Sequence, residues 1–271
     1  MRIFTETMTN SQNIALLIEY LGSSFFGFQK QASTRTIQGE LEATLSKFAN
    51  HPIEIITAGR TDAGVHALNQ IVNFTTTAKR ELHSWVRGIN GLLAPDISIK
   101  QAAIVPHEFS ARFTALSRTY CYYLYVNPIR PAILDARVGW YYAPLDIDSM
   151  RTACQILQGK HDFSSFRASD CQANTPTRTM LESQITVHND IIRFKFTANA
   201  FLYHMVRNMV GALIYVGNGK LSVNEFQDMF LSKNRSKAPP TFMPDGLYLA
   251  DVKYKTPIFN YPKLDWLGLE I

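Results

Sequence analysis

Residues 53–75 read IEIITAGRTDAGVHALNQIVNFT and contain two strand-like runs that bracket a glycine-rich turn. The runs at 53–57 and 69–75 are short, apolar and rich in β-branched residues, which is typical of β-strands. Two glycines flank Asp62 in the turn, so the backbone there can take positive φ angles and another molecule can approach closely. Arg60 can keep the Asp62 carboxylate ionised. The stretch predicts a single acid displayed between two strands.

Strand-like and helical patterns alternate on both sides of this turn. The first half follows the order β-α-β-β-α-β, with elements expected at 14–20, 37–48, 53–57, 69–75, 82–92 and 97–105. The second half repeats the order, with elements expected at 118–126, 147–157, 182–188, 191–197, 201–216, a further helix after Ser222, and 247–254. We therefore expect an α+β fold of two tandem ferredoxin-like halves with antiparallel sheets.

The junction between the halves is expected near Pro106. It divides the chain into an N-terminal tail at 1–13, an N-terminal half at 14–106 that carries the Asp62 turn, and a C-terminal half at 107–271 that completes the active-site cleft.

Composition indicates a globular chain with an excess of positive charge. Of the 271 residues, 46% are hydrophobic and 18% are charged, and 27 Lys and Arg against 22 Asp and Glu give a net charge of +5. A basic chain favours a polyanion as partner, although net charge alone also produces non-specific attraction. No apolar run reaches the roughly 18 residues of a membrane span. We therefore expect a cytoplasmic protein with no membrane association.

The cysteines argue against both disulfides and zinc. Cys121, Cys154 and Cys171 are odd in number and show neither CxxC spacing nor a nearby pair of histidines. We expect no metal site and a reducing compartment.

The stretch 58–74 (AGRTDAGVHALNQIVNF) resembles the central motif of the TruA-type tRNA pseudouridine synthases. Further segments resemble the same family in the family's order, at 19–31, 109–125, 162–178, 198–211 and 246–252. The resemblance implies the pseudouridine synthase fold, a homodimer, and isomerisation of uridines at positions 38, 39 and 40 in the anticodon stem-loop of tRNA. This reaction needs no cofactor.

The resemblance also implies roles for residues at the reacting nucleotide. Asp62 is the catalytic residue, either as a nucleophile or as a base on the ribose. From the residues alone, an aspartate between two glycines is more often a plain turn residue that bonds its own backbone. Tyr120 matches the position that stacks on the target base, although sheet packing also accounts for its ring. Leu249, or its neighbour Tyr248, lines the pocket with apolar surface or packs in the core.

Arg207 belongs to a polar stripe on the apolar helix expected at 201–216. Its other members are His204, Asn208 and Gly211, and such a stripe has to face solvent or a partner. The family indicates Asp62 as the partner of Arg207, and an ion pair between them would lower the pKa of the carboxyl.

Further arginines and aromatic residues are expected to contact RNA. Arg60 can stack where the flipped base was or can bind phosphate. Phe109, Arg112, Arg178 and Lys30 are the other expected contacts, and a solvated loop lysine is the default for Lys30. Asn174 departs from relatives that carry an arginine there, so one phosphate contact is expected to be weaker.

Two rival functions fit parts of the pattern. One is a pseudouridine synthase with another RNA target, because the chemistry of Asp62 does not specify the substrate. The other is an RNA-binding module or tRNA-folding chaperone without catalysis, which the intact run from Arg60 to Asp62 argues against.

Overall fold

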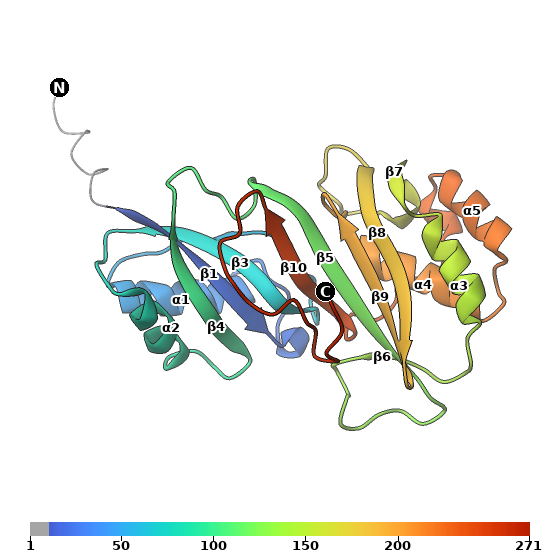
Figure 1. The fold of residues 1–271 in the computed structure, drawn as a ribbon, viewed down its shortest axis with the longest axis horizontal. Helices are drawn as coiled ribbons and strands as arrows, with labels where there is room; N and C mark the ends of the chain where they lie inside the picture. Colours follow the sequence, from blue (N-terminus) through green and yellow to red (C-terminus); the bar gives the residue numbers. More distant parts are fainter. Residues whose placement is uncertain (1–10) are drawn as a thin grey trace. The chain divides into compact units, whose positions relative to one another are not determined.

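The computed structural model describes residues 11–271, and contacts divide them into two compact units (Figure 1). Unit 1 contains the residues up to Leu116 together with Ala250–Glu270, and unit 2 contains Ser117–Leu249. The strand β10 (Leu247–Tyr254) therefore contributes residues to both units.

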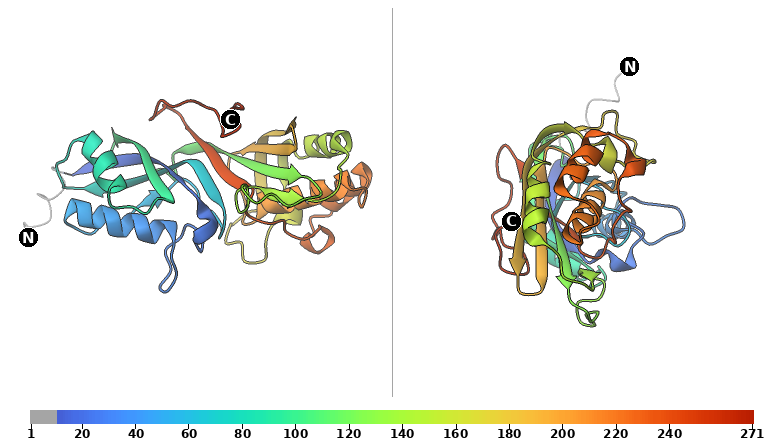
Figure 2. Two further views of the ribbon diagram at one scale, coloured as in Figure 1. Left: turned by 90° about the horizontal axis from the view of Figure 1, so that it is seen from below. Right: turned by 90° about the vertical axis from the view of Figure 1, so that its right-hand side faces the viewer.

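Unit 1 follows the predicted order β-α-β-β-α-β. Its elements are β1 (Gln12–Tyr20), the short 3-10 helix η1 (Gly22–Ser24), α1 (Ile37–Ala49), β2 (Ile56–Thr57), β3 (His66–Thr76), α2 (Leu82–Asn90) and β4 (Ile97–Val105). The tail expected at 1–13 lies outside the described residues as far as residue 10, and β1 already begins at Gln12. The loop between η1 and α1 projects from the body of this unit (Figure 2).

The sheet of unit 1 has the order β4-β1-β3, and both β2 and β10 neighbour β3. The pairings of β1 are antiparallel and place Ile14 opposite both Phe74 and Ile104. The ring of Trp85 in α2 lies 5.2 Å from that of Phe74 and 5.3 Å from that of Phe48 in α1. Trp85 and Phe74 are buried and Phe48 is half-buried, so contacts of these rings attach both helices to the sheet.

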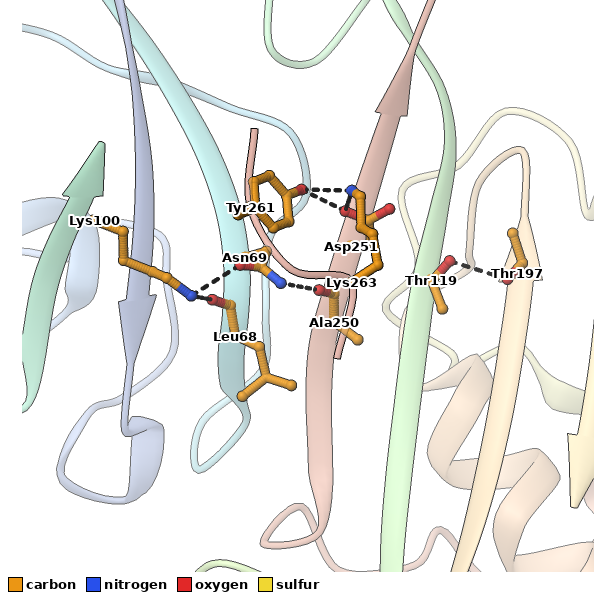
Figure 3. Close-up of polar contacts among 9 residues, drawn as sticks. All are labelled: Leu68, Asn69, Lys100, Thr119, Thr197, Ala250, Asp251, Tyr261 and Lys263. Atoms are coloured by element: carbon orange, nitrogen blue, oxygen red, sulfur yellow. Dashed lines mark hydrogen bonds and ion pairs between the residues drawn. The ribbon is translucent and has the colours of Figure 1, made fainter. Parts of the chain in front are cut away.

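The segment after β10 is tied to unit 1 by polar contacts. Asp251 accepts hydrogen bonds from Tyr261 and Lys263 (Figure 3). Gln101 of β4 donates to the Asn260 carbonyl over 2.8 Å. These contacts fix the segment to β10 and β4.

Polar side chains also link the strands of unit 1 to each other. Asn69 of β3 donates to the Ala250 carbonyl over 2.8 Å and accepts from Lys100 of β4 over 3.0 Å (Figure 3). The Lys100 ammonium donates as well to the Leu68 carbonyl over 3.1 Å. Each of these contacts joins groups that are far apart in the sequence.

Unit 2 repeats the order with two additional short strands. Its elements are β5 (Ala115–Val126), β6 (Gly139–Tyr141), α3 (Ile147–Gln155), β7 (Gly159–Asp162), η2 (Ser164–Phe166), β8 (Thr177–His188), β9 (Ile191–Ala198), α4 (Met205–Gly217), α5 (Val223–Leu231), η3 (Arg235–Lys237) and the first residues of β10. Asn189, with φ of 52°, lies in the tight turn between β8 and β9. Ser222 and Glu225 form the expected capping box.

The sheet of unit 2 has the order β5-β9-β8-β7, with antiparallel pairing throughout and β6 parallel to β5. Thr119 of β5 and Thr197 of β9 face each other with hydroxyl oxygens 3.0 Å apart (Figure 3). The helices α3, α4 and α5 pack together on one face of this sheet (Figure 2). The α+β fold with two ferredoxin-like halves is confirmed.

The compact units divide the chain later than the predicted junction at Pro106. Asn13 donates to the Phe109 carbonyl over 3.0 Å, and the Ala111 amide donates to the side chain of Asn73 over 2.8 Å. These bonds attach the segment after β4 to β1 and β3, so it remains with unit 1 as far as Leu116.

The helix expected at 201–216 is shorter at its start. It begins at Met205, because His204 takes the left-handed backbone conformation with φ of 60° and an α-helix cannot continue through it. His204 therefore lies at the N-cap and outside the helix, and its ring stacks on that of Tyr203 at 3.9 Å.

Candidate active site

Asp62 lies on a tight turn at the start of β3. The Val65 amide donates to the Asp62 carbonyl over 3.2 Å, and Gly64 has φ of 80°, a conformation that favours glycine. The Asp62 side chain is half-buried, whereas Arg60 is exposed. Both side chains are therefore at least partly accessible to a ligand that binds unit 1.

The loop after η1 packs directly against this turn. The Phe28 amide donates to the Thr61 carbonyl over 3.0 Å. Gly27 has φ of 90°, and a Cβ on it would lie 3.1 Å from the Thr61 carbonyl oxygen. Gly22 touches the Val65 carbonyl so closely that a Cβ there would overlap it. The backbone around Asp62 therefore has little room to move.

A buried histidine completes this support. His66 is 0% exposed, and its Nδ1 accepts a hydrogen bond of 2.8 Å from the Gly22 amide. Because Nδ1 is the acceptor, the neutral ring carries its proton on Nε2. Sequence reasoning did not assign His66 a role.

Buried polar side chains of β1 and β3 contact the same turn. The Tyr20 and Thr61 hydroxyl oxygens lie 2.8 Å apart, and Gln70 donates to the Gly59 carbonyl over 2.6 Å. Burial raises the pKa of Tyr20 to about 12, although its hydrogen bonds with the side chains of Thr61 and Gln70 partly oppose that increase. The Tyr20 phenol is therefore neutral at physiological pH.

Lys30 belongs to the projecting loop and already has a partner. Its ammonium lies 3.1 Å from a carboxylate oxygen of Glu42, with side chains that are 62% and 7% exposed respectively. Glu42 also accepts from the Gln38 side chain over 2.8 Å and from the Ile55 amide over 3.2 Å. Sequence analysis did not single out Glu42. Its contacts with Lys30, Gln38 and the Ile55 amide link the loop, α1 and the segment before β2.

Phe109 and Arg112 lie in the segment between β4 and β5. The Phe109 ring lies 5.1 Å from that of Tyr254 in β10, while Arg112 is exposed. The Arg112 guanidinium lies 5.2 Å from the centre of the Phe113 ring, which is 78% exposed. A cation beside an exposed aromatic ring can bind both a phosphate and a base.

Two candidate residues of unit 2 are buried. Tyr120 is 8% exposed, and its ring packs edge-on against Phe201 at 4.9 Å. Leu249 is 0% exposed, so the structure favours the core-packing alternative for it. Its neighbour Tyr248 donates from its hydroxyl to the Arg137 carbonyl over 2.7 Å.

The polar stripe of α4 faces the segment 235–242. Arg207 donates from Nε to the Phe242 carbonyl over 2.8 Å. Asn208 is 0% exposed; it donates to the Phe166 carbonyl over 2.8 Å and accepts from Thr241 over 2.7 Å. The stripe therefore orders this segment, and the pairing of Arg207 with Asp62 stays a prediction.

Arg178 stabilises the start of β8. It donates to the carbonyls of Thr175 and Thr177 over 2.9 and 2.6 Å, and its buried Nε has no hydrogen-bond partner among the described residues. Burial, together with the nearby positive charge of Arg167, lowers the pKa of Arg178, and the charge of Cys171 partly opposes this effect.

The candidate residues divide between the two units. Asp62, Arg60, Lys30, Phe109 and Arg112 belong to unit 1, and the remainder belong to unit 2, namely Tyr120, Arg178, Arg207 and Leu249. Within unit 1 the structure brings the loop of Lys30 against the Asp62 turn.

Neither a metal cluster nor a membrane helix is found in the described part of the chain. Across residues 11–271, no three His, Cys, Asp or Glu side chains are grouped so that they could hold a metal ion. No helix in the same range is long and apolar enough to cross a membrane. The three cysteines are buried, and none of them forms a disulfide within this range.

Comparisons with known proteins identify the family. A family model described as tRNA pseudouridine synthase matches residues 16–114 and 153–255. The chain is 49% identical over 243 residues to tRNA pseudouridine synthase A of Paraburkholderia xenovorans, with 90% of each chain covered. It is 46% identical over 251 residues to the protein of the same name from Nitrosomonas europaea, covering 91% of this chain and 92% of that one.

Likeness to solved structures is much weaker. A chain of the archaeal box H/ACA sRNP Nop10–Cbf5 complex aligns with a TM-score of 0.35 and 9% identity, over 83% of this chain and 60% of that chain. The assignment rests on the sequence matches, which cover most of both halves. By these matches, the chain belongs to the tRNA pseudouridine synthase family.

Proposed function

We propose that this chain isomerises uridines at positions 38, 39 and 40 in the anticodon stem-loop of tRNA to pseudouridine, with Asp62 as the catalytic residue. The observation that carries the proposal is the Asp62 turn, in which a half-buried carboxylate lies on a backbone held by β1, β3 and the loop of Gly27. The enzymes of this family are isomerases, and the matched relatives are named tRNA pseudouridine synthase A.

The reaction breaks the N-glycosidic bond of uridine, turns the uracil and rejoins it through C5. One ionised carboxylate at the sugar suffices, acting as a nucleophile on the sugar or as a base that removes a ribose proton. A fixed turn places Asp62 for either step without reorganisation at the moment of reaction.

The target nucleotide has to leave its stack before Asp62 can reach it. Enzymes that act on a base extrude it into a pocket and hold it against apolar and aromatic side chains. In our proposal Tyr120 stacks on the extruded base and Arg60, which is exposed, occupies the space that the base leaves.

Contacts to the remainder of the tRNA are assigned to arginines and aromatic rings. Arg112 and Phe109 present charge and aromatic surface from unit 1, and Arg178 does so from unit 2. Lys30 is a weaker candidate, since Glu42 already neutralises it. We further propose that Arg207 pairs with Asp62 and that a cytoplasmic homodimer is the active form.

Replacing Asp62 by asparagine tests the catalytic assignment. The amide keeps the shape of the side chain and removes the charge that attack or proton removal requires. We expect no release of tritium from C5-labelled tRNA, while the dissociation constant for tRNA stays within about twofold of the wild-type value. Isomerisation above background by this variant would show that Asp62 is not the reacting group.

Deleting the gene tests the substrate positions. Pseudouridines in total tRNA are mapped by carbodiimide-dependent primer extension in the deletion strain and in its parent. We expect the stops at positions 38 to 40 to vanish and those in the TΨC loop to persist. Persistence at 38 to 40 with loss elsewhere would favour a synthase with another RNA target, and an unchanged map would favour a binding module without catalysis.

A further inference from the structure

A buried polar cluster adjoins the Asp62 turn and has no assigned role in the chemistry. Tyr20 of β1, Thr61 of the turn and Gln70 of β3 are 4%, 7% and 0% exposed. Tyr20 and Thr61 are separated by 41 positions in the sequence, and their hydroxyl oxygens lie 2.8 Å apart. Polar groups so deeply buried require hydrogen-bond partners in the protein.

The hydrogen bonds of these three side chains connect to one another. Gln70 donates from Nε2 to the Gly59 carbonyl over 2.6 Å, and its side chain also hydrogen-bonds to the Tyr20 hydroxyl. The Tyr20 and Thr61 hydroxyls can each donate or accept in the bond between them, and the Gln70 side chain has both a donor and an acceptor. The Gly59 carbonyl, Gln70, Tyr20 and Thr61 are thus linked in one chain of hydrogen bonds.

This chain of bonds holds two points that flank Arg60. One end fixes the Gly59 carbonyl and the other fixes the Thr61 side chain, so the backbone that carries Arg60 and precedes Asp62 is attached to β1 and β3. The Phe28 amide holds the Thr61 carbonyl from the other direction. A fully satisfied buried network of this kind specifies one arrangement more strongly than apolar packing does.

We propose that Tyr20 and Gln70 are positioning residues for the reaction, which hold the segment 59–62 so that the Asp62 carboxylate meets the target nucleotide. The inference rests on the proposed function, because that function makes Asp62, in this segment, the reacting group. Neither side chain touches the substrate in this proposal; both act through the Gly59 carbonyl and the Thr61 side chain.

Replacing Tyr20 by phenylalanine removes the hydroxyl and keeps the ring. We expect kcat for tritium release from C5-labelled tRNA to fall about tenfold, because a small misplacement of a reacting group is costly to turnover. The KM and the dissociation constant for tRNA should stay within about twofold, since no substrate contact is lost.

A pair of substitutions at Thr61 separates the hydroxyl from the shape. Thr61→Ser keeps the hydroxyl that bonds Tyr20 and should keep kcat within about threefold of wild type, whereas Thr61→Val keeps the shape and should match Tyr20→Phe. Because both changes break the same hydrogen bond, the double variant of Tyr20→Phe and Thr61→Val should be no slower than the slower single variant. This pair also keeps the test decisive if Tyr20→Phe does not fold.

Tyr261→Phe is the matched control in the same unit. It removes a hydroxyl that donates to Asp251 of β10 and has no hydrogen bond to residues 59–62 among those described. We expect this variant to lose thermal stability without a change in kcat. Equal kcat for wild type and Tyr20→Phe, or equal losses in Tyr20→Phe and Tyr261→Phe, would overturn the inference.

Failure of the inference is distinguishable from failure of the proposed function. Wild type and Asp62→Asn are assayed beside the other variants. If wild type releases no tritium, or if Asp62→Asn stays active, the proposed function fails. If wild type is active, Asp62→Asn is inactive and Tyr20→Phe turns over at the wild-type rate, only the positioning role fails.

Discussion

Replacing Gly27 by alanine tests how tightly the backbone around Asp62 is constrained. Gly27 has φ of 90°, a conformation that L-residues rarely adopt. A Cβ built on it would lie 3.1 Å from the Thr61 carbonyl oxygen, 3.3 Å from the Ala63 amide nitrogen and 3.4 Å from the Asp62 carbonyl carbon. All three atoms belong to the backbone of the turn, so no flexible side chain can yield.

The expected magnitudes follow from these two features. A positive φ costs an alanine about 1–2 kcal/mol in the folded state. The close contacts require the turn to shift by a few tenths of an ångström. A misplacement of about 1 Å can lower an enzymatic rate about 100-fold, so this smaller shift should lower kcat about five- to tenfold.

Gly219→Ala is the matched control. Gly219 has φ of 75°, and a Cβ there would have no atom within 4 Å. An alanine at position 219 therefore has the same unfavourable backbone free energy but contacts no neighbouring atom. Urea unfolding should show losses of about 1–2 kcal/mol for both variants. Tritium release under single-turnover conditions should be slower for Gly27→Ala alone.

Two outcomes for the Gly27→Ala and Gly219→Ala variants would contradict this prediction. Wild-type kcat in Gly27→Ala, with the expected loss of stability, would show that the Asp62 turn tolerates displacement. Equal slowing in both variants would trace the effect to general destabilisation. Either result would refute the argument that contacts of Gly27 set the position of Asp62.

Three further predictions concern other residues. Arg207→Ala should lower kcat far more than it lowers the affinity for tRNA. Arg235→Ala, which loosens the same segment 235–242, should leave kcat nearly unchanged. Equal losses of kcat in a tritium-release assay would show that Arg207 only stabilises this segment. Arg112→Ala should reduce the slope of log affinity against log salt concentration by about 1, measured by filter binding, and an unchanged slope would exclude a phosphate contact. Burial raises the pKa of Tyr20 from 10.0 to about 12 and that of Cys154 from 9.0 to about 12, so the unfolded chain loses these protons first. Their contribution to the free energy of unfolding should therefore be fully present below pH 9 and be lost between about pH 9 and 12. Urea titrations should show stability falling across that range, and a flat profile there would contradict the burial of these groups.

Regular periodicity predicted most of the elements correctly. The strands β4 and β10 have the predicted bounds, and α1 begins after Thr36 as its cap predicted. Where prediction was wrong, the pattern was ambiguous. Phe201 and Leu202 extend the apolar run of α4, yet apolar character does not distinguish a helical turn from an irregular one. The left-handed backbone of His204 leaves no periodic signal.

The support of the candidate site could not be predicted in the same way. The bonds of Tyr20 to Thr61 and of Gly22 to His66 join residues more than forty positions apart, so no local pattern announces them. Glu42 lies in α1 one turn from the polar Gln38 and Ser46 and resembles a solvated residue, but it is 6% exposed and contacts Lys30 and the Ile55 amide. Sequence motifs identify Asp62, and tertiary contacts determine how it is held.

Because β10 contributes to both units, the chain cannot complete unit 1 in the order in which it is synthesised. The ribosome makes β3 early, but the part of β10 that neighbours it begins at Ala250, after all of unit 2 has emerged. During that interval only β2 pairs with that edge of β3, at Val72 and Asn73, and exposed strand edges promote aggregation. A nascent chain stalled before residue 250 should therefore depend on chaperones, whereas release of the following strand should end that dependence.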